Sequence, residues 1–282
     1  MKQIAVISGK GGTGKTIVTG SFAALAGNKI TVDCDVDAAD LHLLLHPTVK
    51  ERHAFRSGQT AVIDKKFCKK CGKCVSVCRF EAIKTDFTIE PFSCEGCALC
   101  SRICPHGAID MEDNVSGEWF VSDTKYGSFV HAKLGIAEEN SGKLVAKIRQ
   151  VAKELAEKQN LEFVIIDGPP GIGCPVIASL SGVDCALIVT EPTLSGLHDA
   201  KRVMDLAAHF DIPVKTVVNK YDLNPSMTRK IEDFCHQRGV PVIGKIIFDK
   251  AVINALIEGK TIIEYPQSVA GDEIQKIWKN LQ

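Results

Sequence analysis

The sequence predicts an α/β protein: a mostly parallel sheet with helices on both faces, carrying a small inserted α+β domain. Short apolar runs rich in Val and Ile alternate with helical stretches, which is typical of parallel sheets. A glycine-rich segment joins the first run to the first helix. Eight of the 12 cysteines lie between Cys68 and Cys104, where the alternation stops. We therefore expect the α/β domain at 1–57 and 113–282, with the insert at 58–112.

The elements of the α/β domain follow from the pattern of apolar residues. The segment 3–8 holds four consecutive apolar residues and runs directly into glycines, so it predicts a short buried strand. A helix is expected next, from Lys15 to Ala26. Similar patterns predict strands at 29–33, 162–167, 184–190 and 213–219, and helices at 142–159 and 196–210.

The composition makes several classes of protein improbable. The chain has 282 residues, 45% of them hydrophobic, and equal numbers of basic and acidic residues, at 34 each. This balance gives no electrostatic reason to expect a nucleic-acid partner. No apolar run approaches the ~20 residues of a membrane span, and the N-terminus lacks the features of a signal peptide. We expect a cytoplasmic protein without a membrane span.

The segment from Gly9 to Thr16 matches the phosphate-binding pattern G-x-x-x-x-G-K-[ST] and lies between a strand and a helix, as that motif requires. Its glycines allow a tight turn whose backbone N–H groups face phosphates. Lys15 is expected to reach the β- and γ-phosphates of a nucleotide, and the Thr16 hydroxyl to bind Mg²⁺. The nucleotide-binding residues predicted in this loop are Gly9, Lys10, Gly11, Gly12, Thr13, Gly14, Lys15 and Thr16.

Charged residues complete the expected site. Lys10 is a second lysine within the loop, and it either stays solvated or contacts a phosphate, most usefully that of a partner subunit. Asp35 and Asp167 follow apolar strands, at the sheet edge where α/β folds place ligand-binding groups. Asp167 is the expected Mg²⁺-associated acid, although an Asp at a strand end often only caps the next helix. Asp33 and Asp37 are weaker candidates.

These motifs resemble those of the deviant Walker A phosphate-loop ATPases, a family that includes MinD, ParA and the nitrogenase iron protein. The resemblance is carried by Lys10-Gly11-Gly12-Thr13-Gly14-Lys15-Thr16, Asp33-Cys34-Asp35 and Asp167-Gly168-Pro169-Pro170-Gly171. It implies Mg²⁺-dependent ATP hydrolysis in an ATP-bound homodimer. It also implies that Lys10 crosses to the partner's nucleotide and that Asp35 positions the attacking water. The candidate catalytic residues are therefore Lys10, Lys15 and Asp35.

The segment Asn219-Lys220-Tyr221-Asp222 follows a strand and fits N-K-x-D, a pattern whose Asp reads guanine in GTPases. In the MinD-like family the Asn alone commonly contacts adenine, so the resemblance assigns Asn219 to the base. The alternative is that the segment is only the end of a strand. We expect ATP rather than GTP because of Lys10.

Two cysteine repeats occupy the insert: Cys68-x₂-Cys71-x₂-Cys74-x₃-Cys78 and Cys94-x₂-Cys97-x₂-Cys100-x₃-Cys104. Each fits the bacterial ferredoxin run C-x₂-C-x₂-C-x₃-C-P, except that Arg79 replaces the first Pro. Because the fourth cysteine of each run ligates the other cluster, two [4Fe–4S] clusters are expected, one on Cys68, Cys71, Cys74 and Cys104 and one on Cys94, Cys97, Cys100 and Cys78. Paired zinc sites are the alternative, which this spacing suits less well. Over 64–112 the insert resembles two-cluster ferredoxins.

Three other features have both a structural and a functional interpretation. Cys174 is a weak candidate for a metal ligand at a dimer interface. A C-terminal apolar stripe either packs on the body of the protein, the commoner outcome, or binds a membrane surface: Ile274, Ile277, Trp278 and Leu281. Five lysines in the first half of the insert either offset cluster charge or form a docking face for an acidic redox partner: Lys65, Lys66, Lys69, Lys70 and Lys73.

As a whole, the chain resembles MinD-superfamily ATPases that carry an inserted two-cluster ferredoxin domain. The resemblance implies ATP, Mg²⁺ and two [4Fe–4S] clusters as cofactors, and a redox or metalloprotein partner. Three functions stay open: an ATP-dependent dimer that transfers electrons to a partner metalloprotein, an ATP-dependent factor for metal or iron–sulfur cluster assembly or insertion, and a redox-sensing regulatory or positioning ATPase. The complete ligand sets favour the first two, and we lean slightly to the first.

Overall fold

The computed structural model describes residues 1–135 and 141–282, and the contacts within it divide the chain into two units. Unit 1 comprises Met1–His53, Trp119–Lys133 and Ser141–Gln282. Unit 2 comprises Ala54–Glu118 and the short segment that begins at Leu134. Unit 2 thus contains the segment 58–112, together with adjoining residues on both sides.

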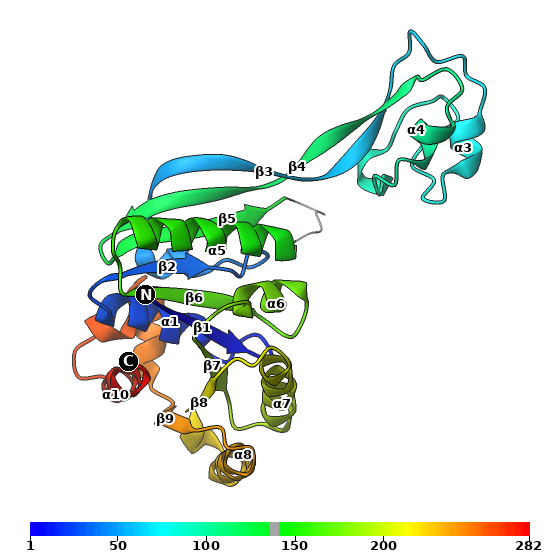
Figure 1. Cartoon of the computed structure of the whole chain (residues 1–282). Helices are drawn as coiled ribbons and strands as arrows, with labels where there is room; N and C mark the ends of the chain where they lie inside the picture. The colour runs from blue at the N-terminus through cyan, green and yellow to red at the C-terminus, as the bar shows by residue number, and fades with distance from the viewer. Residues whose placement is uncertain (136–140) are drawn as a thin grey trace. The chain divides into compact units, whose positions relative to one another are not determined.

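Within the described residues, one sheet of nine strands has the order β3-β4-β5-β2-β6-β1-β7-β8-β9 (Figure 1). All neighbours from β5 to β9 are parallel. This confirms the predicted α/β class and its mostly parallel sheet. The bounds are β1 Lys2–Ser8, β2 Lys29–Asp33, β3 Thr48–Ile63, β4 Ile109–Thr124, β5 Gly127–Leu134, β6 Phe163–Pro170, β7 Cys185–Thr190, β8 Val214–Asn219 and β9 Val242–Ile246.

The predicted helices and strands of the α/β domain agree closely with those observed. The described α-helices are α1 Lys15–Leu25, α2 His42–Leu45, α3 Lys73–Val77, α4 Leu99–Ile103, α5 Ser141–Lys158, α6 Cys174–Leu180, α7 Leu194–His209, α8 Pro225–Gln237, α9 Lys250–Ile257 and α10 Val269–Leu281. Short 3₁₀ helices occur at Pro91–Ser93, Tyr221–Leu223 and Ile262–Glu264.

Different helices cover the two faces of the central strands. Ile4 of β1 packs with Phe22 of α1 and Trp278 of α10 in one buried cluster. Side chains alternate along a strand, so Gln3 points to the opposite face. There its amide oxygen accepts a hydrogen bond of 2.9 Å from Arg149 of α5. The central strands therefore have helices on both faces, as predicted.

Strand β6 extends further than the sequence suggests. The apolar run predicts that the strand ends at Asp167 and gives way to a Gly/Pro loop, but β6 continues to Pro170. The pairing of β2 with β6 ends where Asp33 lies opposite Asp167. The prolines beyond that point therefore need no N–H group toward β2. The loop begins instead at Gly171, whose N–H donates to the Ser8 carbonyl at 3.0 Å.

The sequence pattern does not reveal strands β3, β4 and β5. β3 and β4 have 16 residues each and belong partly to unit 1 and partly to unit 2. The Asp64 N–H donates to the Ala108 carbonyl, and the Ser116 hydroxyl donates to the Ser57 carbonyl. Residue numbers thus rise along one strand as they fall along the other, so β3 and β4 are antiparallel. A two-residue turn then joins β4 to β5, which makes that pair a hairpin.

The two cysteine repeats of unit 2 fold alike. In each repeat the residue before and the residue after the second cysteine have positive φ: Lys70 and Gly72 in the first, and Gly96 and Ala98 in the second. A five-residue helix follows each of these turns, α3 in the first repeat and α4 in the second. The internal repeat of the sequence is therefore also a repeat of backbone conformation.

The C-terminal helix α10 packs on the body of unit 1. The four residues of its apolar stripe are at most 4% exposed and belong to the cluster of Phe22: Ile274, Ile277, Trp278 and Leu281. The structure thus favours the packing interpretation over a membrane-binding stripe. No helix among the described residues has the length and apolar character needed to span a membrane.

We predict that replacing Trp278 with Ala destabilises unit 1. The centroid of its ring lies 5.0 Å from that of Phe22 and 5.4 Å from that of Phe163. Removing a buried aromatic ring from such a core costs about 3–5 kcal/mol of unfolding free energy. Urea denaturation followed by circular dichroism measures the loss, with exposed Lys279→Ala on the same helix as the control. Equal stability of the two variants would contradict the buried packing.

Candidate functional site

The phosphate loop connects the carboxyl end of β1 to α1. Gly12 and Gly14 have φ values of 78° and 90°, a conformation that favours glycine. A Cβ at Gly14 would also lie 2.3 Å from the side-chain nitrogen of Asn219. The buried hydroxyl of Thr13 has no hydrogen-bond partner in the part of the chain that the structure describes. It is therefore available to a ligand oxygen.

Lys15 lies among three carboxylates. Its Nζ is 3.0 Å from Oδ1 of Asp167 and 3.9 Å from Oδ2 of Asp35. Burial lowers the pKa of the Lys15 ammonium, but attraction from Asp167 and Asp33 outweighs burial and raises the pKa overall. Lys15 therefore stays charged at neutral pH. Three carboxyl groups share this one ammonium, and carboxylate oxygens are ligands that Mg²⁺ prefers in proteins.

Asp167 joins the first turn of α1 to the end of the sheet. Its carboxylate is 1% exposed and accepts hydrogen bonds from the hydroxyls of Thr16, at 2.9 Å, and Thr19, at 2.7 Å. The structure thus brings together Thr16 and Asp167, the two residues assigned to Mg²⁺ from the sequence. The sequence reasoning missed Thr19. Its spacing of one helical turn after Lys15 is a signal that could have found it.

Asp33 and Asp35 differ in access. Asp33 is buried and accepts the backbone N–H groups of Asp35, at 3.0 Å, and Leu41, at 3.3 Å. Burial, with the charge of Asp167, raises the pKa of Asp33 well above its ordinary value. The Asp35 side chain is 16% exposed, and burial raises its pKa to about 6 although Lys15 opposes this. Asp33 therefore shapes the loop, while Asp35 is accessible to a ligand.

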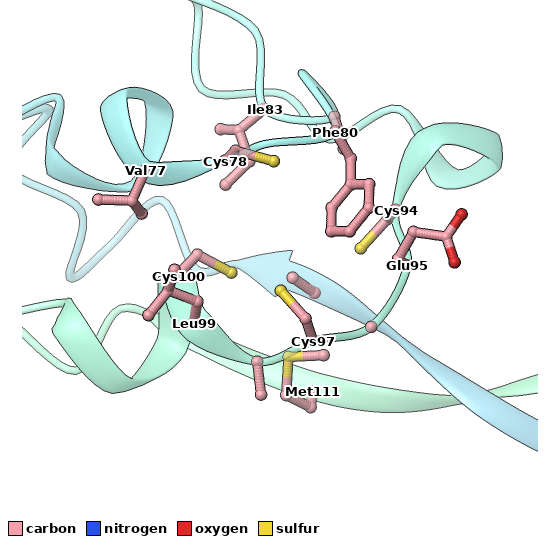
Figure 2. A pocket seen from close by; sticks show the side chains of 14 residues that line it. Val77, Cys78, Phe80, Ile83, Cys94, Glu95, Cys97, Leu99, Cys100 and Met111 are labelled. Atoms are coloured by element: carbon pink, nitrogen blue, oxygen red, sulfur yellow. The ribbon is translucent and has the colours of Figure 1, made fainter.

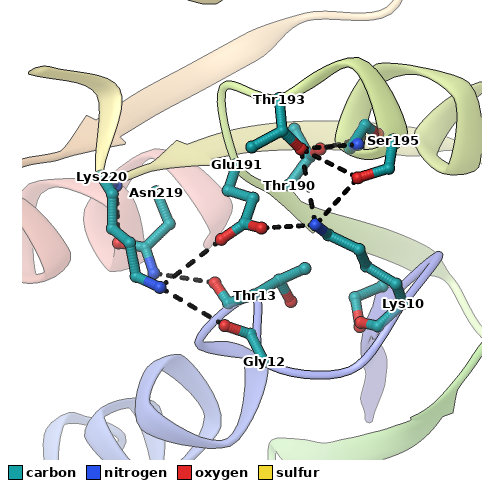
Figure 3. Close-up of polar contacts among 11 residues, drawn as sticks. Lys10, Gly12, Thr13, Thr190, Glu191, Thr193, Ser195, Asn219 and Lys220 are labelled. Carbon is teal, nitrogen blue, oxygen red and sulfur yellow. Dashed lines mark hydrogen bonds and ion pairs between the residues drawn. The ribbon is translucent and has the colours of Figure 1, made fainter. Parts of the chain in front are cut away.

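Lys10 is bound by its own chain. Its Nζ lies 2.5 Å from Oε1 of Glu191 and 3.1 Å from Oγ of Ser195 (Figure 3). Lys220 Nζ lies 3.5 Å from the other carboxylate oxygen of Glu191. Burial raises the pKa of Glu191, but the two lysines outweigh burial and lower it overall. The sequence reasoning did not single out Glu191, because only the sheet order places the end of β7 next to the phosphate loop.

The segment assigned to the base is tied to the phosphate loop. The Asn219 side-chain amide donates to the Thr13 carbonyl at 2.8 Å (Figure 3). Its oxygen accepts the N–H of Lys220 at 3.0 Å. Asp222 accepts the backbone N–H of Phe248 at 2.7 Å, so this carboxylate is engaged within the fold.

The eight cysteines of the repeats gather in two groups of four. One cavity of unit 2 is lined by Cys68, Cys71, Cys74 and Cys104, and a second by Cys78, Cys94, Cys97 and Cys100. Figure 2 shows the sulfur atoms of the second group pointing into a common space. Each group takes three cysteines from one repeat and the fourth from the other. These are the two sets that the spacing predicts.

Among the described residues, no three His, Cys, Asp or Glu side chains are placed to hold one metal ion. In a [4Fe–4S] cluster each cysteine binds a different iron, so the four sulfur atoms surround the cluster without meeting at one point. The Ala108 N–H also donates to Sγ of Cys104 at 3.3 Å, a hydrogen bond of the type that tunes cluster ligands. Cys174 is exposed and belongs to neither group.

The chain is similar to known proteins over most of its length. A family profile described as "CobQ/CobB/MinD/ParA nucleotide binding domain" matches residues 4–262. The uncharacterized protein MJ0578 of Methanocaldococcus jannaschii is 37% identical over 79% of this chain and 79% of its own. The uncharacterized protein MJ0579 of that organism is 26% identical over 94% of this chain and 93% of its own.

Solved structures extend the comparison to the fold. The septum site-determining protein MinD of Pyrococcus horikoshii OT3, complexed with Mg-ADP, matches with a TM-score of 0.61 and 17% identity. The match covers 100% of this chain and 96% of that one. At this identity the likeness establishes a shared fold.

We predict that Asp35 makes the nucleotide-free protein less stable as the pH rises from about 4 to about 6. Its pKa is about 6 in the folded chain against an ordinary 3.8, so the folded state binds more protons in this range. The contribution of Asp35 to the free energy of unfolding is therefore fully present below this pH range and lost above it. It amounts to at most about 3 kcal/mol.

Urea denaturation in EDTA, from pH 4.5 to 7.5, measures this effect. The stability of the wild type minus that of Asp35→Asn should fall as the pH rises. Asp37→Asn, an exposed neighbour, serves as the control. A difference between wild type and Asp35→Asn that stays constant with pH would show that Asp35 titrates normally.

Proposed function

We propose that this chain, which belongs to the CobQ/CobB/MinD/ParA nucleotide-binding family, is an ATP-hydrolysing iron–sulfur protein. It couples nucleotide-dependent dimerisation to electron transfer to a partner metalloprotein. The observation that carries the proposal is the combination of a phosphate loop linked to buried acids with two cavities that are each lined by four cysteines.

The nucleotide half of the proposal rests on the groups around Lys15. Lys15 would neutralise phosphate charge, and the free hydroxyl of Thr13 would donate to a phosphate oxygen. Thr16 and Asp167 would hold Mg²⁺, and Asp35 would orient the attacking water. The Mg-ADP bound by the MinD of P. horikoshii supports a magnesium nucleotide as the ligand.

ATP is favoured over GTP by Lys10, the second lysine of the phosphate loop. Asp222, which reads guanine in the N-K-x-D pattern of GTPases, accepts the N–H of Phe248 through one oxygen and keeps the other. Asn219 keeps one amide hydrogen and one oxygen lone pair beyond its bonds to Thr13 and Lys220. These are the groups that an adenine contact requires.

The redox half rests on the cysteine groups. Cys68, Cys71, Cys74 and Cys104 would hold one [4Fe–4S] cluster, and Cys78, Cys94, Cys97 and Cys100 the other. Such clusters accept and release single electrons when bound. Burial raises the pKa of the Cys74 and Cys100 thiols, so these two cysteines need a positive partner to become thiolates.

A second function, the assembly or insertion of clusters, is favoured by one observation. Cys71 and Cys97, one in each group, are exposed. A cluster held there would be open to an acceptor protein and could leave as cargo. The third function, a positioning ATPase, gains no support from the apolar stripe of α10, because these residues are buried and do not form a membrane-binding surface.

We predict that Lys10→Ala removes the part of the ATPase activity that depends on protein concentration while ATP still binds. The reason is that Lys10 would act in a partner's site, whereas Lys15 acts in its own. Phosphate release is measured over a range of protein concentrations, together with binding of a fluorescent ATP analogue. Lys15→Ala should be inactive at every concentration. Wild-type activity of Lys10→Ala throughout would contradict a role in the partner's site.

We predict that anaerobically purified protein contains two [4Fe–4S] clusters whose potential responds to Mg-ATP. A redox titration followed by EPR should show a midpoint shift of about 60 mV, which for one electron is a tenfold change in equilibrium. Cys71→Ser and Cys97→Ser should each lose one cluster and still bind ATP, whereas Cys174→Ser should keep both.

Each outcome of this titration has a distinct meaning. Absence of iron after anaerobic reconstitution would overturn the redox half of the proposal. Clusters whose midpoint potential does not change with Mg-ATP would favour cluster assembly over gated electron transfer. Transfer of iron to an apo-acceptor protein would then be measured.

A further inference from the structure

The two cysteine-lined cavities of unit 2 differ in the charge of their surroundings. The cavity of Cys68, Cys71, Cys74 and Cys104 is also lined by Lys69, Lys70 and Lys73. The cavity of the other group has one charged lining residue, Glu95, beside apolar residues such as Phe80 and Leu99. The ligand sets are equivalent, so the lysines distinguish the first cavity from the second.

We define the lysine face as Lys65, Lys66, Lys69, Lys70 and Lys73. All five residues are exposed, and within the described part of the chain none forms an ion pair with a carboxylate. Two acids of the same loops keep their charge, and the charge of Lys65 adds to the hydrogen bonds from Thr88 that lower the pKa of Asp86. Asp64 accepts the Lys66 N–H at 2.8 Å, and Asp86 accepts that of Thr88 at 3.0 Å. Lys69, Lys70 and Lys73 line one cavity, so this part of the lysine face concentrates positive charge.

Two further exposed residues belong to the same segment of the chain. Phe67 lies between the lysines in sequence and is 58% exposed, although large aromatic side chains are usually buried. Exposed aromatic residues within a charged rim are typical centres of protein–protein contact. Cys71, a predicted cluster ligand, is also exposed here, so an electron has a short route from this cavity to a docked protein.

Neutralisation of cluster charge does not explain the lysines by itself. A cluster in the second cavity would carry the same charge on the same number of thiolates. That cavity nevertheless has no lysine among its lining residues. Comparison of the two cavities thus indicates that this fold does not require lysines beside each cysteine group.

We propose that the lysine face is the docking site for an acidic one-electron carrier protein. This inference rests on the proposed function, because it needs a redox cluster in the adjacent cavity. On docking, one electron passes to the carrier, whose flavin or iron–sulfur centre is reduced by one electron. The cluster held by Cys68, Cys71, Cys74 and Cys104 is oxidised by one electron.

The test uses an acidic flavodoxin as the carrier and basic cytochrome c as the opposite probe. The protein is reduced, freed of reductant and mixed with each probe at about 20 and about 200 mM salt, a range over which screening of exposed charges increases strongly. The test variant is the triple change Lys69→Gln, Lys70→Gln and Lys73→Gln. The control removes three exposed lysines of unit 1: Lys158→Gln, Lys230→Gln and Lys279→Gln.

We expect the wild type and the control variant to reduce flavodoxin at least tenfold more slowly at high salt, and the test variant to be slow at both salt concentrations. The rate of cytochrome c reduction should not fall in this way at high salt. Binding of fluorescently labelled flavodoxin to the oxidised protein should weaken in the same pattern. Equal rates and affinities for the test and control variants, or no effect of salt, would overturn the docking site.

Iron content and EPR spectra of every variant separate this failure from failure of the proposed function. Absence of clusters from the wild type would overturn both. Normal clusters with unchanged rates and affinities would overturn the docking site alone. Loss of a cluster from the test variant alone would show that the lysines retain the cluster, which also overturns the docking role.

Discussion

The nucleotide site depends on the buried ion pair between Lys15 and Asp167. Asp167 lies where the pairing of β6 with β2 ends, and β6 lies between β1 and β2 in the sheet. The loop after β1 and the acids after β2 therefore both come within reach of it. An isolated buried carboxylate would be costly, but Lys15, Thr16 and Thr19 satisfy this one. Asp33 and Asp35 lie near the same ammonium, and burial nevertheless raises the pKa of both carboxyl groups.

A different constraint governs unit 2, whose core is small and contains its own candidate ligands. The buried residues of the core are Ala61, Cys74, Ile83 and Ile109, and Cys78, Cys94, Cys100 and Cys104 pack against them. Segments of this size bury little apolar surface, so bound metal often supplies part of their folding energy. In unit 2, the side chains that would bind iron are also those that fill the core. Folding and cluster binding are therefore expected to be linked.

The sequence reveals features that depend on local spacing and misses those that depend on neighbours in space. The phosphate loop and the four-cysteine runs are local, and even the exchange of Cys78 and Cys104 between groups follows from their spacing. Glu191 has no local signature, because it becomes relevant only when β7 lies beside β1. Strands β3 and β4 pair with each other although the two cysteine repeats separate them in sequence. Neither strand therefore shows the alternation with helices that identifies the central strands. β6 continues through Pro170 because its pairing with β2 has already ended at Asp167, and that pairing is a contact between segments far apart in sequence.

The contacts of Glu191 explain how Lys10 could be held by its own chain and still serve a partner. Removing one member of a buried ion pair leaves an uncompensated charge, which is costly. Glu191 is bound by Lys10 and also by Lys220, so it keeps a cationic partner when Lys10 departs. The side chain of Lys10 is itself 29% exposed. The phosphate charge of a second nucleotide could therefore compete with Glu191 for Lys10 without leaving the half-buried Glu191 carboxylate unpaired.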